Sequence, residues 1–104
     1  MTTELQLTAD RTADGEPRLT AVGEIDLSNA EEFTRALAGA VGPAGRLVVD
    51  LTRVDYLDSA ALAALFAQAG QIEIHIAALN ESLFTVCGLA ELTEVRVTPP
   101  ATAG

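Results

Sequence analysis

The chain has 104 residues, of which 49% are hydrophobic, 20% charged and 4% aromatic. This composition predicts one folded domain with a core of aliphatic side chains, and it excludes a disordered chain. Fifteen acidic residues against six basic ones give a formal net charge of −9. We therefore expect no nucleic acid and no membrane among its partners, because both favour basic surfaces.

The residue types that are rare in this chain exclude several kinds of chemistry. All six basic residues are arginines, so the lysine of a P-loop or of a protein kinase is missing. Cys87 has no second cysteine with which to form a disulfide, and its spacing from His75 does not match a zinc site. We expect a cytoplasmic protein that is not an enzyme, with no catalytic residues, no metal and no cofactor.

In chain order, the first pattern is an alternation of Leu5 and Leu7 with polar residues, which indicates a strand. Residues 10–17 are rich in turn-forming residues, and residues 18–22 have the pattern of a second strand. The chain is therefore expected to open with an antiparallel hairpin.

The next pattern is helical. Ser28 followed by Glu31 is a capping-box pattern, which predicts a first helix with Ser28 as its N-cap. Glycine and proline at residues 42–45 end this helix. Residues 47–51 are almost continuously apolar, which is typical of a strand that is covered on both faces.

The remainder of the chain alternates between helical and strand patterns. Residues 52–58 are expected to form a connector, and a second helix begins at Ser59 and ends before Gly70. Asn80 is the expected N-cap of a third helix, with Gly88 just beyond its end. The predicted strand, third helix and last strand occupy residues 72–76, 81–87 and 95–97.

This order, β-β-α-β-α-β-α-β, predicts an α/β fold in which helices pack on a mixed β-sheet. We expect a single domain over residues 1–104, with its core at about residues 4–98 and a flexible tail at residues 99–104. Right-handed crossovers make the strands after the hairpin parallel, so Asp26 and residues 50–59 are expected to emerge at the same edge of the sheet. Ligands and partners of open α/β sheets favour that edge.

Asp58 and Ser59 stand at the predicted start of the second helix. Either side chain can cap the helix, because a short side-chain oxygen accepts a hydrogen bond from an unpaired backbone N–H. A phosphate on Ser59 would be favoured by the helix N-terminus but opposed by the carboxylates of Asp58, Asp55 and Asp26. The residues alone therefore leave two interpretations open, a simple helix cap or a hydroxyl at which phosphorylation changes binding.

The second helix carries no charged residue, so it is expected to be buried or docked against a partner. A helical wheel places four side chains toward the core, namely Leu62, Leu65, Phe66 and Ala69. The same wheel places four small side chains on the outer face, namely Ala60, Ala63, Ala64 and Ala67. Such a face allows a partner to approach the helix backbone closely, although an alanine-rich surface without a partner is the alternative.

Three stretches of the sequence resemble the STAS domain, which sulphate transporters and anti-sigma factor antagonists share. Residues 47–62 are similar to the family's run of an apolar strand, Asp-Leu, a spacer and Asp-Ser-Ser-Gly-Leu. Residues 23–26 resemble the Gly-Glu-Leu-Asp that precedes the family's first helix, and residues 83–92 resemble its third helix. The resemblance extends over about residues 4–98 in the family's order.

The resemblance implies a bacterial anti-sigma factor antagonist. Such a protein binds an anti-sigma factor with serine kinase activity, which itself holds ATP and Mg, and thereby releases a sigma factor. The kinase phosphorylates the serine that matches Ser59 and so breaks the complex, and a phosphatase restores the binding form. Asp26 matches a position that contacts the kinase, and Asp58 matches the acid before the phosphorylated serine. Together with the predicted outer face, the expected partner-binding residues are Asp26, Asp58, Ser59, Ala60, Ala63, Ala64 and Ala67.

The sequence departs from the family's pattern at Ala60 and Ala61, which replace the second serine and the glycine. We expect the Cβ of Ala61 to obstruct a close approach by a kinase backbone. The alternative function is a STAS scaffold subunit, not phosphorylated, of a transport complex such as a lipid-transport ABC system, or of a stress-signalling complex. A phospho-receiver that binds Mg²⁺ through Asp50, Asp55 and Asp58 is disfavoured, because that chemistry normally also uses a lysine.

Overall fold

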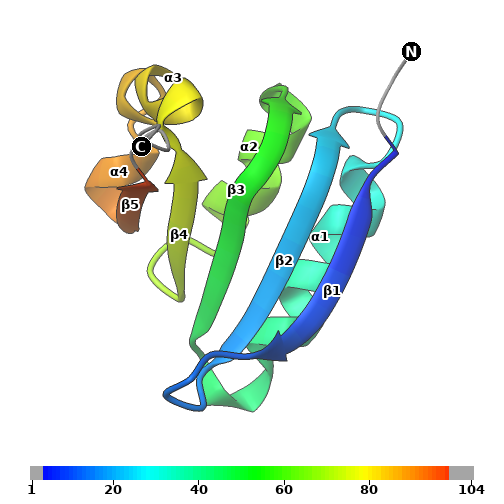
Figure 1. Cartoon of the computed structure of the whole chain (residues 1–104), viewed down its shortest axis with the longest axis vertical. Helices are drawn as coiled ribbons and strands as arrows, with labels where there is room; N and C mark the ends of the chain where they lie inside the picture. Colours follow the sequence, from blue (N-terminus) through cyan, green and yellow to red (C-terminus); the bar gives the residue numbers. More distant parts are fainter. Residues whose placement is uncertain (1–3, 99–104) are drawn as a thin grey trace, which may run out of the picture.

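The computed structural model describes residues 4–98, which form a five-stranded sheet with the strands in sequence order (Figure 1). Strand β1 (Gln6–Arg11) pairs antiparallel with β2 (Pro17–Ile25), whereas all later neighbours are parallel. The later strands are β3 (Leu47–Leu57), β4 (Ile72–Ala77) and β5 (Glu94–Thr98). The predicted fold class, a mixed α/β sheet with an opening hairpin, is confirmed.

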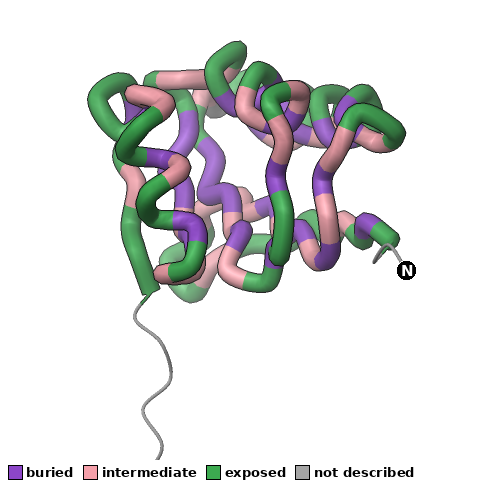
Figure 2. Tube along the Cα trace, turned by 90° about the horizontal axis from the view of Figure 1, so that it is seen from above, coloured by how far each residue is buried: buried purple, intermediate pink, exposed green. Residues whose placement is uncertain are grey.

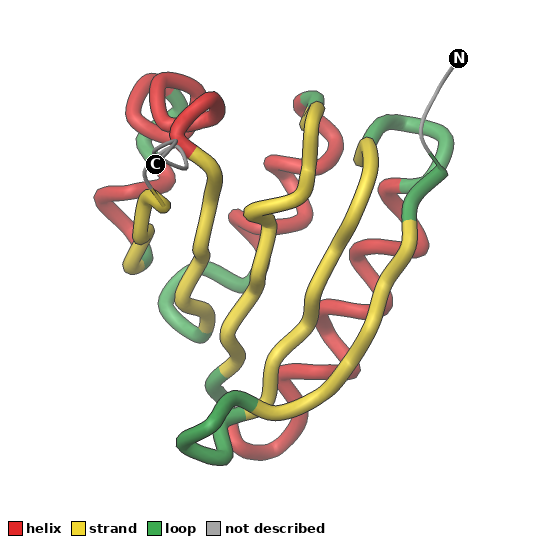
Figure 3. Tube along the Cα trace, viewed as in Figure 1, coloured by secondary structure: helices red, strands yellow, loops and turns green. Residues whose placement is uncertain are grey.

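Helices cover one face of this sheet. The helices are α1 (Ala30–Val41), α2 (Ser59–Ala67), α3 (Glu81–Val86) and α4 (Leu89–Leu92), with short 3₁₀ turns η1 (Gly42–Ala44) and η2 (Ala78–Asn80). Figures 1 and 3 show α1 and α2 behind the strands, with α3 and α4 beside β4 and β5. Right-handed crossovers that always step to the next strand place consecutive helices on the same side.

The core lies between the helices and this face of the sheet, and aliphatic side chains dominate it as the composition predicts. Its fully buried members include Ile25, Phe33, Leu37, Leu47, Val49, Leu51, Leu65, Ile74, Ile76, Phe84 and Leu89. In Figure 2 the buried segments follow the inner strands, whereas the outer strands β1 and β5 are mostly exposed. The inner strands are therefore the rigid support from which the loops at their ends project.

Strand β3 is longer than the sequence pattern predicts, because it runs to Leu57 where we expected a connector from residue 52. Val54 and Leu57 remain in the core, at 1% and 5% exposure. The pairing of β3 with β2 contains two register shifts, which break the regular alternation of buried and exposed residues. A search for strict alternation therefore misses the second half of this strand.

The expected capping box of the first helix does not form. Helix α1 begins at Ala30, and its N-cap position is Asn29. The hydroxyl of Ser28 instead donates to Oδ1 of Asp26, so Ser28 belongs to the turn that precedes the helix. The predicted end of α3 is correct, since Gly88 follows it with a φ of 82°, but the additional single turn α4 was not expected.

Among residues 4–98, no helix has the length and apolar character needed to cross a membrane. The tail predicted at residues 99–104 lies outside the described residues.

Candidate functional site

Strands β2, β3 and β4 run parallel, so their carboxyl ends lie at the same edge of the sheet, where the three arrowheads point in Figure 1. We call the segments that follow these strands, residues 26–29, 58–60 and 78–80, the carboxyl edge. As predicted, Asp26 and Ser59 both belong to it. The backbone N–H of Asp58 donates to the carbonyl oxygen of Ile25 at 3.2 Å, which joins the first two segments directly.

The side chain of Asp58 is the N-cap of α2, and it also holds the neighbouring segment. Its Oδ1 accepts hydrogen bonds from the backbone N–H groups of Ala60 and Ala61, at 2.9 and 3.1 Å. Its Oδ2 accepts a hydrogen bond from the N–H of Leu27, at 2.9 Å. Because Asp58 caps the helix, the hydroxyl of Ser59 is not needed for that role. Ser59 is the first residue of α2 and is exposed.

A second carboxylate, Asp26, builds the turn between β2 and α1. Its Oδ1 accepts from both the N–H and the hydroxyl of Ser28, and its own N–H donates to Oδ1 of Asn29 at 2.9 Å. The side-chain amide of Asn29 then donates to the carbonyl of Glu24 at 3.0 Å. The half-buried carboxylate of Asp26 is thus held in place at the carboxyl edge. The next residue in the chain, Leu27, is the one that bonds to Asp58.

The third segment is held by Asn80, which the sequence analysis assigned only to helix capping. Asn80 does stand at the N-cap position of α3, but its side chain makes no capping bond. Its Nδ2 donates instead to the carbonyl of Val54 at 3.0 Å, and the residue is only 7% exposed. The β3–β4 pairing extends only as far as Leu51 and Ile76, so this bond holds η2 against the part of β3 that continues beyond its pairing with β4. Asparagine before a helix signals a cap, and nothing local reveals this long-range contact.

Helix α2 is rotated relative to the predicted wheel. Ala63 and Ala67 are exposed as expected and Ala60 is half-buried, but Ala64 lies in the core at 5% exposure. Phe66, expected in the core, is 36% exposed on the outer side. The prediction was wrong for these two residues because α2 contains no charged side chain, and no polar one after Ser59, that would mark its outer face.

The Cβ of Ala61 does not lie where a partner would meet it. Ala61 is 0% exposed and belongs to the core, so the expected obstruction at this position is wrong. Of the two departures from the Asp-Ser-Ser-Gly pattern, only Ala60 reaches the surface, and it is half-buried. The exposed outer side of α2 is formed by Ser59, Ala63, Phe66 and Ala67.

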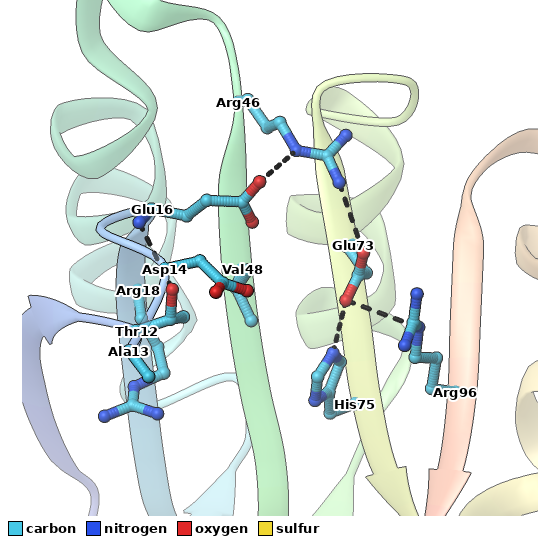
Figure 4. Close-up of a pocket in the computed structure, with 10 residues that line it drawn as sticks. All are labelled: Thr12, Ala13, Asp14, Glu16, Arg18, Arg46, Val48, Glu73, His75 and Arg96. Carbon is cyan, nitrogen blue, oxygen red and sulfur yellow. Dashed lines mark hydrogen bonds and ion pairs between the residues drawn. The ribbon is translucent and has the colours of Figure 1, made fainter.

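A rival site lies on the opposite, helix-free face of the sheet, which we call the open face. A cavity of about 450 Å³ there is lined by Thr12, Ala13, Asp14, Glu16, Arg18, Arg46, Val48, Glu73, His75 and Arg96 (Figure 4). Three of the six arginines and the one histidine thus line a single cavity. Val48 is 3% exposed at its floor, so polar side chains cover this face of β3, where we had expected a second apolar layer.

The positive charges of this cavity are already paired. The carboxylate of Glu73, whose side chain is 9% exposed, contacts Arg46 at 3.2 Å, His75 at 2.6 Å and Arg96 at 3.4 Å. Arg46 also contacts Glu16 at 3.2 Å, and Arg18 contacts Asp10 outside the cavity at 2.7 Å.

The hydrogen bond with His75, helped by the charge of Arg96, lowers the pKa of Glu73 although burial acts in the opposite direction. The cluster therefore holds β3, β4 and β5 together more readily than it would bind an added anion.

Two of the three carboxylates considered for a Mg²⁺ site, Asp50 and Asp58, serve other roles. The Oδ1 atom of Asp50 accepts from the N–H and hydroxyl of Thr52, at 3.0 and 2.7 Å, in the middle of β3. Asp58 is engaged as the cap of α2. Within residues 4–98, no group of three histidine, cysteine, aspartate or glutamate side chains is arranged to hold a metal ion.

Comparisons with known proteins bear on both the family and the fold. A family model described as "Mlab, STAS domain" matches residues 8–95. Among solved structures, an anti-sigma factor antagonist from Mycobacterium paratuberculosis is 21% identical over 89% of this chain and 86% of its own, with a TM-score of 0.79. The unphosphorylated form of the anti-sigma factor antagonist SpoIIAA is 14% identical over 92% and 89%, with a TM-score of 0.66.

At these identities the two solved structures bear on the fold alone, and that fold matches. A search of curated proteins by sequence finds no match.

Proposed function

Since the chain belongs to the STAS domain family, we propose that it is an anti-sigma factor antagonist rather than an enzyme. In this proposal it binds an anti-sigma factor that is also a serine kinase, in the bacterial cytoplasm, and so releases a sigma factor. Phosphorylation of Ser59 ends the binding, and a phosphatase restores it. The observation that carries the proposal is the exposed side chain of Ser59 in the first turn of α2. Asp58 caps this helix, so the Ser59 hydroxyl is not used for capping.

The partner supplies the chemistry of the switch, and this chain supplies a hydroxyl. The Ser59 oxygen attacks the γ-phosphorus of ATP held with Mg²⁺ by the kinase, the bond to the ADP oxygen breaks, and the serine proton passes to a base of the kinase. The phosphatase transfers the phosphoryl group to water and regenerates the hydroxyl. Neither step requires a catalytic residue or a cofactor from this chain.

The surroundings of Ser59 explain why a phosphoryl group would expel a partner. Phosphorylation adds a charge of about −1.5 to −2 at neutral pH, next to Asp58 in the chain and at the edge that also carries Asp26. In an interface that also covers Ala63 and Ala67, that charge would be desolvated and repelled. A difference of about 3 kcal/mol is enough to weaken binding more than a hundredfold.

The experiment uses the full chain, purified serine-kinase anti-sigma factors and ATP with Mg²⁺. We expect mass spectrometry to place the phosphate on Ser59, and Ser59→Ala to bind the kinase as the wild type does without being labelled. Ser59→Asp should lose binding more than about a hundredfold. Ser82, an exposed serine of α3, is the matched control, because Ser82→Ala and Ser82→Asp should both bind normally.

Two outcomes would contradict the switch. One is phosphate on another residue, or on none with any kinase tested. The other is that Ser59→Ala and Ser59→Asp bind the same partner equally well. That result would favour the alternative function, a scaffold subunit of a transport or stress-signalling complex.

A further inference from the structure

Two exposed leucines stand on either side of the segment that carries Ser59. Leu27 follows β2 and is 81% exposed, and Leu79 follows β4 and is 68% exposed. Ser59 follows β3, the strand that lies between β2 and β4 in Figure 1. All three residues therefore lie at the carboxyl edge. Single exposed leucines are common on protein surfaces, but two that flank one exposed hydroxyl call for an explanation.

Both leucines are held by side chains from the neighbouring strand region rather than carried on free loops. The N–H of Leu27 donates to Oδ2 of Asp58 at 2.9 Å. Leu79 lies within η2, next to Asn80, whose buried side chain bonds the carbonyl of Val54 at 3.0 Å. Fixing the backbone that carries an exposed apolar side chain lowers the entropy that association must overcome. The two bonds therefore hold the segments that carry these leucines in place before a partner binds.

The charge of this edge indicates what kind of surface can cover it. Asp26 and Asp58 belong to the edge, Asp55 is exposed near the end of β3, and Glu81 is exposed just after η2. Arg53 lies further down β3, opposite Val22. A second copy of this chain would bring the same carboxylates together, and an anionic membrane would repel them. A basic protein surface is the complementary occupant.

We propose that Leu27 and Leu79 are the two apolar contacts by which this chain docks on a basic protein surface, one on each side of Ser59. This inference rests on the proposed function, because the serine-kinase anti-sigma factor is the protein that would present that surface. The partner must offer two apolar recesses separated by the site that receives the Ser59 hydroxyl, with its basic residues at the rim, opposite Asp26 and Glu81, rather than at that site. Phosphorylation then places a charge between two apolar contacts, where its desolvation is most costly.

The test compares leucine-to-serine variants of the full chain in calorimetric titrations with a purified serine-kinase anti-sigma factor. Leu27→Ser and Leu79→Ser should each weaken binding at least about tenfold, because each removes a leucine that the partner buries. Leu92→Ser is the matched control. Leu92 is 59% exposed, and the next residue, Thr93, donates to the carbonyl of Ile72 at the start of β4, which places Leu92 at the opposite edge. The affinity of Leu92→Ser for the kinase should stay within about twofold of the wild-type affinity.

Two further measurements sharpen the test. All three variants should unfold at the wild-type temperature, since the replaced side chains are exposed. Binding by the wild type should weaken steeply between about 0.05 and 0.5 M salt, because the partner is basic.

The outcomes separate this inference from the proposed function. Normal binding by both Leu27→Ser and Leu79→Ser overturns the inference alone. If no serine-kinase anti-sigma factor binds the wild type, both proposals fall. The basic-protein assignment is overturned if ultracentrifugation shows a wild-type dimer that Leu27→Ser dissociates, or if vesicles containing phosphatidylserine bind the wild type but not Leu27→Ser.

Discussion

The carboxyl edge and the open face both gather carboxylates, but their surroundings differ. At the open face, the carboxylate of Glu73 contacts Arg46, Arg96 and His75, so charges within the cluster cancel one another. At the carboxyl edge, the carboxylates of Asp26 and Asp58 accept hydrogen bonds from backbone N–H groups and a hydroxyl, none of which carries a full charge. The negative charge of the edge is therefore held in place without being neutralised.

This difference shows why a cavity and a cluster of ionisable groups do not identify the functional site by themselves. The open face has the larger collection of charged side chains, yet the arginines of its cavity, Arg18, Arg46 and Arg96, contact carboxylates of the same chain. The carboxyl edge has no comparable network, but it retains a field that attracts a basic partner and repels a phosphate placed on Ser59. The same residue type is structural in one setting and available for recognition in the other.

The largest effect on stability is expected from removing the carboxylate at the centre of the open face. Glu73→Ala leaves Arg46, His75 and Arg96 without their shared partner, and it should lower the free energy of unfolding by about 2–3 kcal/mol, as measured by urea denaturation. Glu32→Ala, at an exposed position of α1 away from this cluster, is the control and should cost well under about 1 kcal/mol.

Kinase binding by the folded Glu73→Ala protein should stay unchanged. Lost binding with unchanged stability would instead place the functional site on the open face.

A smaller loss of stability is expected at the carboxyl edge. Asp58→Ala removes the N-cap of α2 and should cost about 1–2 kcal/mol in denaturation experiments. Asp58→Asn retains a good capping side chain, but its amide nitrogen cannot accept the hydrogen bond from Leu27. This variant should therefore keep most of the stability while the Leu27 amide exchanges its hydrogen faster in NMR measurements. Unchanged exchange at Leu27 would show that the bond does not hold this segment.

The pH dependence of stability should also distinguish the two regions. Because the folded state lowers the pKa of Glu73, its stabilisation is fully present above the pKa of an ordinary glutamate. It is lost as the pH falls through the depressed value, when the carboxylate takes up a proton in the folded state as well. The unfolding temperature of the wild type should fall as the pH is lowered through this range. Glu73→Gln should lack the part of that fall that comes from protonation of Glu73. An identical acid profile for the two proteins would contradict the assignment.

The smallest effect is expected at an exposed ion pair of the hairpin. Arg18 lowers the pKa of Asp10 through a hydrogen bond, but the pair lies in solvent, which weakens its energetic contribution. Asp10→Asn should leave both the unfolding temperature and kinase binding unchanged within error. A clear shift in the unfolding temperature or in kinase binding would mean that the exposed rim of the open face, as well as Glu73, contributes to that property.

Local patterns predict the elements of this chain well where each element buries one continuous apolar segment. The hairpin, the order of strands and helices, and the start of α2 at Ser59 follow from alternation, helical spacing and turn-forming residues. Local sequence patterns fail to predict the structure where the pattern is irregular or absent. The register shifts between β2 and β3 hide the end of β3. The lack of polar residues in α2 after Ser59 leaves the positions of Ala64 and Phe66 undetermined.

The sequence by itself determined that this is a mixed α/β domain with an acid and a serine at a helix start, because those features depend on neighbouring residues. Only the tertiary structure decided that Asp58 bonds to Leu27 and that Asn80 bonds to Val54. It also decided that Glu73 contacts Arg46 and Arg96. Those contacts join different strands, whose spacing is set by the packed sheet rather than by any local preference. Which carboxylates are neutralised and which remain available to a partner therefore depends on the assembled sheet.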